Sequence, residues 1–161
     1  MQQFPGPAQP LIARMTEAAL AAPEKAVAYQ GAPGANSHIA ALGAFPDCLP
    51  LPCFGFGDAI DAVREGRAEL AMLPVENSTY GRGADIHTLL PESGLHIIDE
   101  AFVRVHINLL ALPGTTLDQV THAMSHTVLL GQCKSQIRDL GDVYAPWRVR
   151  RHFNSGGDFA L

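Results

Sequence analysis

Apolar and polar residues follow one another along this chain in blocks of strand and helix length. The run Ala26–Gln30 is short and apolar, as in a buried strand. It leads into the glycine- and proline-rich stretch Gly31–Ser37, where Asn36 or Ser37 is expected to cap a helix that stops before Pro46. A strand, a tight loop and a capped helix in this order predict an α/β fold.

The same alternation continues in the next segment. Cys48–Cys53 is predicted to be a strand at the edge of a sheet, because proline cannot donate to a hydrogen-bonded ladder. A helix is predicted after it, ending at Gly66. Its apolar face consists of residues spaced three or four apart, namely Phe56, Ala59, Ile60 and Val63.

A third apolar run, Leu70–Val75, ends in three polar residues. Ligands of α/β proteins bind at the carboxyl ends of strands, so Glu76, Asn77 and Ser78 are candidate site residues. A polar turn after an edge strand would have the same composition. Arg82, in a loop expected to be flexible, either pairs with a carboxylate ligand or faces solvent.

The second half of the chain carries weaker patterns. A short helix, Asp85–Leu90, is expected to end at Pro91. Leu95–Leu112 reads as a long extended stretch with alternating apolar residues, which predicts a half-buried strand that crosses between two lobes. Thr116 and Gln119 fit a capping box, and a short strand is expected just before Ser125.

The last predicted helix begins at Ser125 and reaches Leu140. Its apolar residues fall at spacings of three, four and three. Ser125 is either a ligand-binding residue or only an N-cap, and Gln132 is either a site residue or a surface one. After Gly141 the periodic pattern fades.

Composition narrows the function classes. With 161 residues, a net charge of -5 and no basic stripe, the chain is not expected to bind nucleic acid, and no apolar run is long enough to span a membrane. Residues 1–24 are interpreted as a flexible leader with one short helix, Leu11–Ala22. Three cysteines without metal-type spacing indicate free thiols and a cytoplasmic protein. No metal or cofactor is expected.

Neutral polar groups recur where strands end and helices begin. Backbone N–H groups of a glycine-rich loop and a helix start favour anions, so these groups suit a small polyanionic ligand. The loop at Gly31 is neither a Walker loop nor a dinucleotide fingerprint, and a structural turn without a ligand is the alternative. The residues concerned are Asn36, Ser37, Asn77, Ser78, Ser125 and Gln132.

Three stretches in order carry a resemblance to prephenate dehydratases. Val27–Ser37 is similar to the family's opening strand and Gly-Pro-x-Gly-Thr-x-Ser loop, although Ala35 stands where threonine is usual. Leu73–Ser78 resembles its Pro-x-Glu-Asn-Ser motif. Ser125–His126 with Gln132–Cys133 resembles its Ser-His-Pro-Gln-Ala-Leu-x-Gln-Cys motif. The resemblance covers Ala26 to about Leu140.

The resemblance implies an α/β fold with two lobes of the periplasmic-binding-protein type II kind and a ligand cleft between them. Residues 25–140 would form a partial domain with an incomplete second lobe, and 141–161 a divergent tail. The family's Thr-Arg-Phe motif, whose threonine is a candidate acid, and its regulatory ACT domain have no match here. A truncation or frame change near Gly141 is the expected cause.

The resemblance also implies an activity without a cofactor. Prephenate would lose water and carbon dioxide to give phenylpyruvate, in phenylalanine biosynthesis. Candidate catalytic residues are Glu76, Asn77 and Ser78, and candidate substrate-binding residues are Gly34, Asn36, Ser37, Ser125, His126 and Gln132. Arogenate is an alternative substrate, and a homodimer is an open possibility.

Two other functions fit the same residues. A truncated, catalytically impaired remnant would at most bind aromatic acids. A small-solute binding module would share the two-lobe fold, although no export signal precedes it in this sequence. A shortened second lobe is expected to expose apolar surface and favour self-association.

Overall fold

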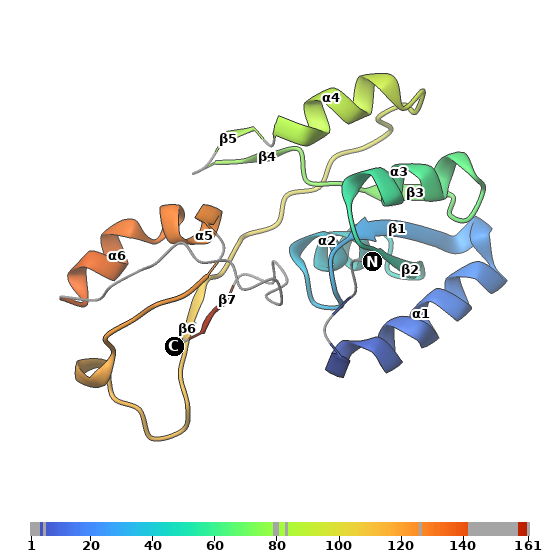
Figure 1. Ribbon diagram of the computed structural model, residues 1–161. Helices are drawn as coiled ribbons and strands as arrows, with labels where there is room; N and C mark the ends of the chain where they lie inside the picture. The colour runs from blue at the N-terminus through green and yellow to red at the C-terminus, as the bar shows by residue number, and fades with distance from the viewer. Residues whose placement is uncertain are drawn as a thin grey trace.

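The chain begins with a small parallel sheet and its helices and continues into an extended second part (Figure 1). The structure is a computed structural model that describes Phe4 and residues 6–78, 81–82, 84–125, 127–141 and 158–160. Its helices and strands are α1 (Gln9–Ala21), β1 (Ala26–Gln30), α2 (Asn36–Ala44), β2 (Leu49–Cys53), α3 (Phe56–Arg64), β3 (Leu70–Met72), β4 (Glu76–Asn77), β5 (Gly81–Arg82), α4 (Ala84–Glu92), β6 (Asn108–Leu110), α5 (Thr127–Gln132), α6 (Lys134–Asp139) and β7 (Asp158–Ala160). Three short 3-10 helices are η1 (Gly6–Ala8), η2 (Pro23–Lys25) and η3 (Leu117–Gln119).

The parallel sheet has the strand order β2-β1-β3. The central strand β1 pairs with β2 from Ala26–Leu49 to Gln30–Cys53, and with β3 from Val27–Leu70 to Tyr29–Met72. Because successive side chains of a strand point to opposite faces, Ala26 and Ala28 face one layer while Val27 and Tyr29 face the other. All four side chains are buried, as expected of a strand covered on both sides. The predicted α/β fold class is confirmed.

The two faces of this sheet are covered by different helices. Ala26 and Ala28 belong to a core cluster with Ala19 of α1 and with Ala59 and Ala62 of α3. Small side chains allow these helices to approach the sheet closely. On the other face, Tyr29 stacks on His38 of α2.

The N-terminal segment differs from the expected flexible leader. The helix predicted for Leu11–Ala22 is present as α1, and its Ala19 is fully buried in the core. Phe4 also contacts Phe54, with ring centroids 5.7 Å apart. The leader interpretation is therefore wrong for α1, because an alanine-rich stretch gives little periodic signal even when one face is buried.

Several predicted elements are confirmed. β2 is an edge strand, and it carries the two prolines that predicted this position. α3 has the expected bounds, and Gly66 follows it with φ of +71°, a conformation that favours glycine. The capping box at η3 is also present, with the Thr116 N–H donating to Gln119 Oε1 at 3.1 Å.

Other boundaries are corrected. The third strand ends at Met72 and not at Val75. The segment expected to be a flexible loop contains β5, which pairs antiparallel with β4. α4 continues through Pro91 to Glu92, so the proline lies in its last turn and does not end the helix at Leu90.

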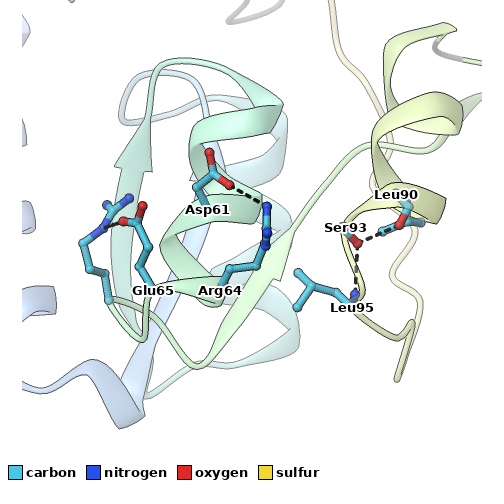
Figure 2. A network of polar contacts seen from close by, with 7 residues as sticks. Asp61, Arg64, Glu65, Leu90, Ser93 and Leu95 are labelled. Carbon is cyan, nitrogen blue, oxygen red and sulfur yellow. Dashed lines mark hydrogen bonds and ion pairs between the residues drawn. The ribbon is translucent and has the colours of Figure 1, made fainter.

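The end of α4 is secured by a buried serine. The Ser93 hydroxyl donates to the Leu90 carbonyl at 2.6 Å and accepts the Leu95 N–H at 3.0 Å (Figure 2). Gly94 between them has φ of +74°. These contacts set the direction in which the extended segment leaves the N-terminal unit.

The second part has less regular structure than its pattern predicts. Only Asn108–Leu110 of the expected long strand is assigned as a strand, β6, and it pairs in parallel with β7. The extended run before it leads from α4 towards α5 and α6 (Figure 1). The strand expected at Ala123–Met124 is reduced to isolated bridges at His122 and Met124.

The helix predicted from Ser125 to Leu140 is divided into α5 and α6. Cys133 separates them and is the N-cap residue of α6. The predicted apolar seam is nonetheless retained, because Ile137 is buried and Leu130, Cys133 and Leu140 are half-buried.

Candidate functional site

The loop after β1 is held by two backbone hydrogen bonds, one to the end of β2 and one within the loop. The Gly31 N–H donates to the Cys53 carbonyl at 2.9 Å, and the Ala35 N–H donates to the Ala32 carbonyl at 3.0 Å. Gly31 and Gly34 have φ of +114° and +92°, which explains the need for glycine at both positions. The loop is therefore a defined turn that places the start of α2 at the carboxyl edge of the sheet.

The start of α2 differs from the predicted cap. The N-cap residue is Ala35, and neither Asn36 nor Ser37 caps the helix through its side chain. Ser37 is buried, with 8% of its surface exposed, and Asn36 is half-buried. The first-turn N–H groups of an α-helix lack helical acceptors, so this end of α2 still favours an anion.

His38 is a residue that the sequence reasoning missed. Its Nδ1 accepts the Gly34 N–H at 3.0 Å, and its ring stacks on Tyr29 with centroids 4.9 Å apart and 17° between the planes. Burial lowers the pKa of His38 below its ordinary value. The signal in the sequence was the position of the histidine in the first helical turn, four residues after the second loop glycine.

Tyr29 beneath this histidine is fully buried. Within the described part of the chain its hydroxyl has no hydrogen-bond partner. Burial is the main cause that raises the pKa of Tyr29 well above its usual range, with a smaller contribution from Cys53. The phenol is therefore neutral under ordinary conditions.

Glu76, Asn77 and Ser78 lie together at the β4–β5 hairpin. Glu76 and Asn77 pair with Arg82 and Gly81 in the antiparallel register. Glu76 and Ser78 are exposed, and Asn77 is half-buried and engaged in an interaction within the protein. The chain reaches this hairpin from the carboxyl end of β3, the edge from which the Gly31 loop also leaves the sheet.

The other candidate residues lie in the second part of the chain. Ser125 is buried, with 7% of its surface exposed, and is engaged in an interaction within the protein. Gln132 is the last residue of α5 and is half-buried. His126 lies outside the described residues. The candidate residues thus fall into three groups, at the start of α2, on the hairpin and around α5.

A shallow depression of about 420 Å³ lies at the end of β2, next to the Gly31 loop, and is lined by Pro52, Cys53, Phe54, Asp58 and Arg67. Asp58 already accepts the Gly55 N–H at 2.8 Å as part of the α3 cap, and Arg67 pairs with Glu65 at 2.7 Å. Burial raises the pKa of the Cys53 thiol to about 11, which makes it a poor nucleophile. The sequence did not select these residues, and their polar groups are already engaged.

The described residues contain neither a metal-binding cluster nor a membrane-spanning helix. Across the described residues, no group of three or more His, Cys, Asp or Glu side chains is placed to hold a metal ion. No helix in the part of the chain described here is long and apolar enough to cross a membrane. All three cysteines are free thiols, as predicted.

One family of known proteins matches most of the chain. The sequence profile described as prephenate dehydratase matches residues 27–148. The match includes all three motif stretches and continues beyond Leu140, into the segment expected to be divergent.

Two curated relatives share more than two fifths of their aligned residues with this chain. The bifunctional N-acyl-homoserine lactone acylase/prephenate dehydratase of Komagataeibacter europaeus is 48% identical over 118 residues, covering 73% of this chain and 42% of the relative. Arogenate dehydratase 4, chloroplastic, of Arabidopsis thaliana is 42% identical over 149 residues, covering 92% of this chain and 34% of the relative. The chain spans less than half the length of each.

A solved structure has a similar fold. The chain titled "GqqA- a novel type of quorum quenching acylases" aligns with a TM-score of 0.60 and 43% identity, covering 84% of this chain and 51% of that one. This likeness agrees with the predicted α/β fold of the periplasmic-binding-protein type II kind.

Proposed function

Because the chain belongs to the prephenate dehydratase family, we propose that it acts as a prephenate dehydratase-type lyase that converts prephenate to phenylpyruvate, water and carbon dioxide. The observation that carries the proposal is the family match over residues 27–148, which includes the loop, hairpin and α5 motifs. The names of two relatives also include a dehydratase, of prephenate in one and of arogenate in the other. Such a lyase would belong to aromatic amino-acid biosynthesis.

The reaction requires the site to bind two carboxylates, to orient the ring and to protonate the departing hydroxyl. The ring carboxylate leaves as carbon dioxide, its bonding electrons enter the ring, and the ring hydroxyl departs as water after it gains a proton. A protein accelerates this by holding both carboxylates, by orienting the ring and by general acid action at the hydroxyl. No cofactor is part of the proposal.

Each candidate group has a proposed role in this reaction. The start of α2, with Asn36 and Ser37, binds a substrate carboxylate through backbone N–H groups. Gly34, whose N–H donates to His38, shapes the loop that presents this helix start. Glu76 orients the substrate or assists hydroxyl departure, and its exposure on β4 leaves the carboxyl accessible. The remaining candidates, Asn77, Ser78, Ser125, His126 and Gln132, are proposed to contact substrate oxygens.

The direct test is turnover of prephenate by the purified chain at neutral pH, followed as phenylpyruvate formation. A rate above the spontaneous one is expected. Glu76→Gln should lower kcat on the order of 100-fold if its carboxyl assists the departing hydroxyl. Glu69→Gln, at an exposed carboxylate just before β3, is the matched control and should leave the rate unchanged. Spontaneous rates in all three samples would contradict the proposal.

Arogenate is a second substrate to test. Several plant relatives are named arogenate dehydratases, whereas the bacterial relative is named for prephenate. The ratio of kcat/KM for the two substrates assigns the preference. Prephenate is proposed as the better substrate because the relative with 48% identity carries its name.

A second candidate function is hydrolysis of N-acyl-homoserine lactones. The bacterial relative is named as bifunctional, and the solved structure is titled as an acylase. Incubation with an N-acyl-homoserine lactone and detection of the free fatty acid tests this activity. Acid release without phenylpyruvate formation would replace the first proposal with this one.

A third candidate is binding without turnover, as in an impaired remnant or a solute-binding module. The chain spans only 34% to 42% of the two relatives compared above. Calorimetric titration separates these two possibilities. An impaired remnant should bind phenylpyruvate, whereas a solute-binding module should bind a non-aromatic dicarboxylate.

The proposal also includes a cytoplasmic location, which the three free thiols support, and a homodimer.

A further inference from the structure

The imidazole of His38 and the turn that precedes α2 are joined by a single hydrogen bond. Counted from the N-cap Ala35, His38 is the third helical residue, and Gly34 lies one residue before the cap. In an ordinary capping box the third residue accepts the N–H of the cap itself. Here the side chain reaches one residue further back and engages a glycine N–H in the left-handed region.

We propose that His38 is the positioning residue of the Gly31–Ser37 loop: its neutral imidazole accepts the Gly34 N–H and rests on Tyr29, which fixes the loop relative to the first turn of α2 for carboxylate binding. This rests on the proposed function for the identity of the ligand. The contact itself belongs to the free protein and is tested there.

Only one protonation state of His38 permits this contact. Nδ1 is an acceptor when the ring is neutral and its proton is on Nε2, whereas imidazolium carries protons on both nitrogens. In the charged form Nδ1–H would point at the Gly34 N–H, and the bond would be lost. Protonation of His38 should therefore release the loop from the helix.

The surroundings favour the neutral ring. α2 packs against β1, β2 and β3, and the titratable residues of these strands are Tyr29 and Cys53. Tyr29 has a raised pKa, as does Cys53, so both are neutral near pH 7. No carboxylate on those strands stabilises imidazolium, and burial of the ring opposes its charge.

The Gly34 N–H is consequently not a donor to the ligand. The carboxylate of prephenate would instead be bound by N–H groups in the first turn of α2, which lack helical acceptors. A ligand that requires the fixed loop binds the neutral form of His38 more tightly. By linkage, its binding should lower the pKa of His38, whereas direct contact between imidazolium and the carboxylate would raise that pKa.

Two variants separate the hydrogen bond from the ring contact. His38→Phe keeps an aromatic ring on Tyr29 and removes the acceptor. His38→Asn removes the ring and supplies a carbonyl acceptor close to the position of Nδ1. His96→Asn, at an exposed histidine after α4, is the matched control.

The first measurement uses the free 161-residue chain. Nitrogen-proton correlation spectra should show an unprotonated Nδ1 at His38 at neutral pH. Hydrogen exchange at the Gly34 amide should be about fivefold faster in His38→Phe and close to wild type in His38→Asn and His96→Asn, the change expected for one net hydrogen bond. Equal protection of Gly34 in wild type and His38→Phe overturns the inference.

The second measurement is the prephenate KM, or the dissociation constant if turnover is absent, between pH 5.5 and 8. His38→Phe should raise it about fivefold with little change in kcat, His38→Asn should restore it, and the wild-type value should rise as pH falls. A His38 pKa that rises on prephenate binding overturns the positioning role. A wild-type chain that protects Gly34 but neither binds nor converts prephenate supports the loop contact and refutes the proposed function.

Discussion

The N-terminal α/β unit and the second part of the chain bury their apolar residues to very different extents. Of the buried apolar residues in the described structure, fourteen lie between Ala19 and Ile86, and three lie beyond, namely Val120, Ala123 and Ile137. Large apolar side chains that remain exposed in the N-terminal unit are 38% to 51% exposed. In the second part Ile97, Phe102 and Leu112 are 71%, 89% and 78% exposed.

The two regions differ in which elements cover their apolar faces. In β1 both faces are covered, because α1 and α3 pack on one side and α2 on the other. From Phe102 to Leu110 the exposure alternates as predicted, with half-buried Val103 and Val105 between exposed neighbours. Only Asn108–Leu110 is assigned as a strand there. Alternation therefore indicates which face is apolar, whereas pairing decides whether a strand forms.

The largest expected effect contrasts one buried and one exposed residue. Ile86→Ala in α4 should lower the free energy of unfolding by about 2–5 kcal/mol, because Ile86 is only 1% exposed and its removal leaves a cavity. Phe102→Ala should change it by less than about 0.5 kcal/mol, since the ring is 89% exposed. Urea denaturation followed by circular dichroism measures both.

The same two variants test whether the two regions differ in packing. A loss above about 2 kcal/mol for Phe102→Ala would mean that the second part has a packed core that includes this ring. A small effect of Ile86→Ala would mean that α4 does not belong to the cooperative N-terminal unit.

The next effect concerns association. The exposed apolar side chains of the second part favour contacts between copies of the chain. Wild-type protein should therefore self-associate at micromolar concentrations. Phe102→Ser combined with Leu112→Ser should shift the average mass in light scattering towards the monomer. Phe54→Ser, at a ring that is 38% exposed in the N-terminal unit, is the matched control and should leave the average mass unchanged. A monodisperse wild-type monomer would remove the basis of this prediction.

The elements that could be predicted from the sequence are those that depend on local pattern, and the others depend on distant contacts. β1, the edge position of β2, and α3 with Gly66 all depend on local pattern and turn chemistry, and each is confirmed. The packing of α1 could not be predicted, because alanine carries little periodic signal and its burial depends on a distant sheet. The β4–β5 pairing and the break at Cys133 likewise depend on tertiary context.

The candidate site shows the same limit. Sequence motifs identified the loop, the hairpin and α5, but not the state of their hydrogen-bonding groups. The Gly34 N–H was expected to face an anion, and the structure gives it to His38. Such a contact depends on a rotamer and on the stacked Tyr29, and neither is encoded by spacing alone.

A smaller effect is expected at the buried phenol of the central strand. Tyr29→Phe should raise the free energy of unfolding by about 1 kcal/mol, because it removes a buried hydroxyl that lacks a partner in the described structure and keeps the ring that stacks on His38. In thermal unfolding this corresponds to a rise of about 2–4 °C in Tm. A loss of stability would reveal a partner for the hydroxyl, and Tyr29→Leu, which also removes the ring, should be destabilising in either case.

The smallest effect is the dependence of stability on the protonation of His38. The folded-state pKa lies below the ordinary value of 6.5, so the unfolded chain takes up the proton first as the pH falls. The contribution of His38 to stability is fully present above pH 6.5 and is lost progressively down to the folded-state pKa, below which it falls no further. His38→Asn should flatten the wild-type curve in this window, and His96→Asn should not. If both variants follow the wild-type curve, the N-terminal unit does not depend on a neutral His38, and its loop is held by backbone contacts alone.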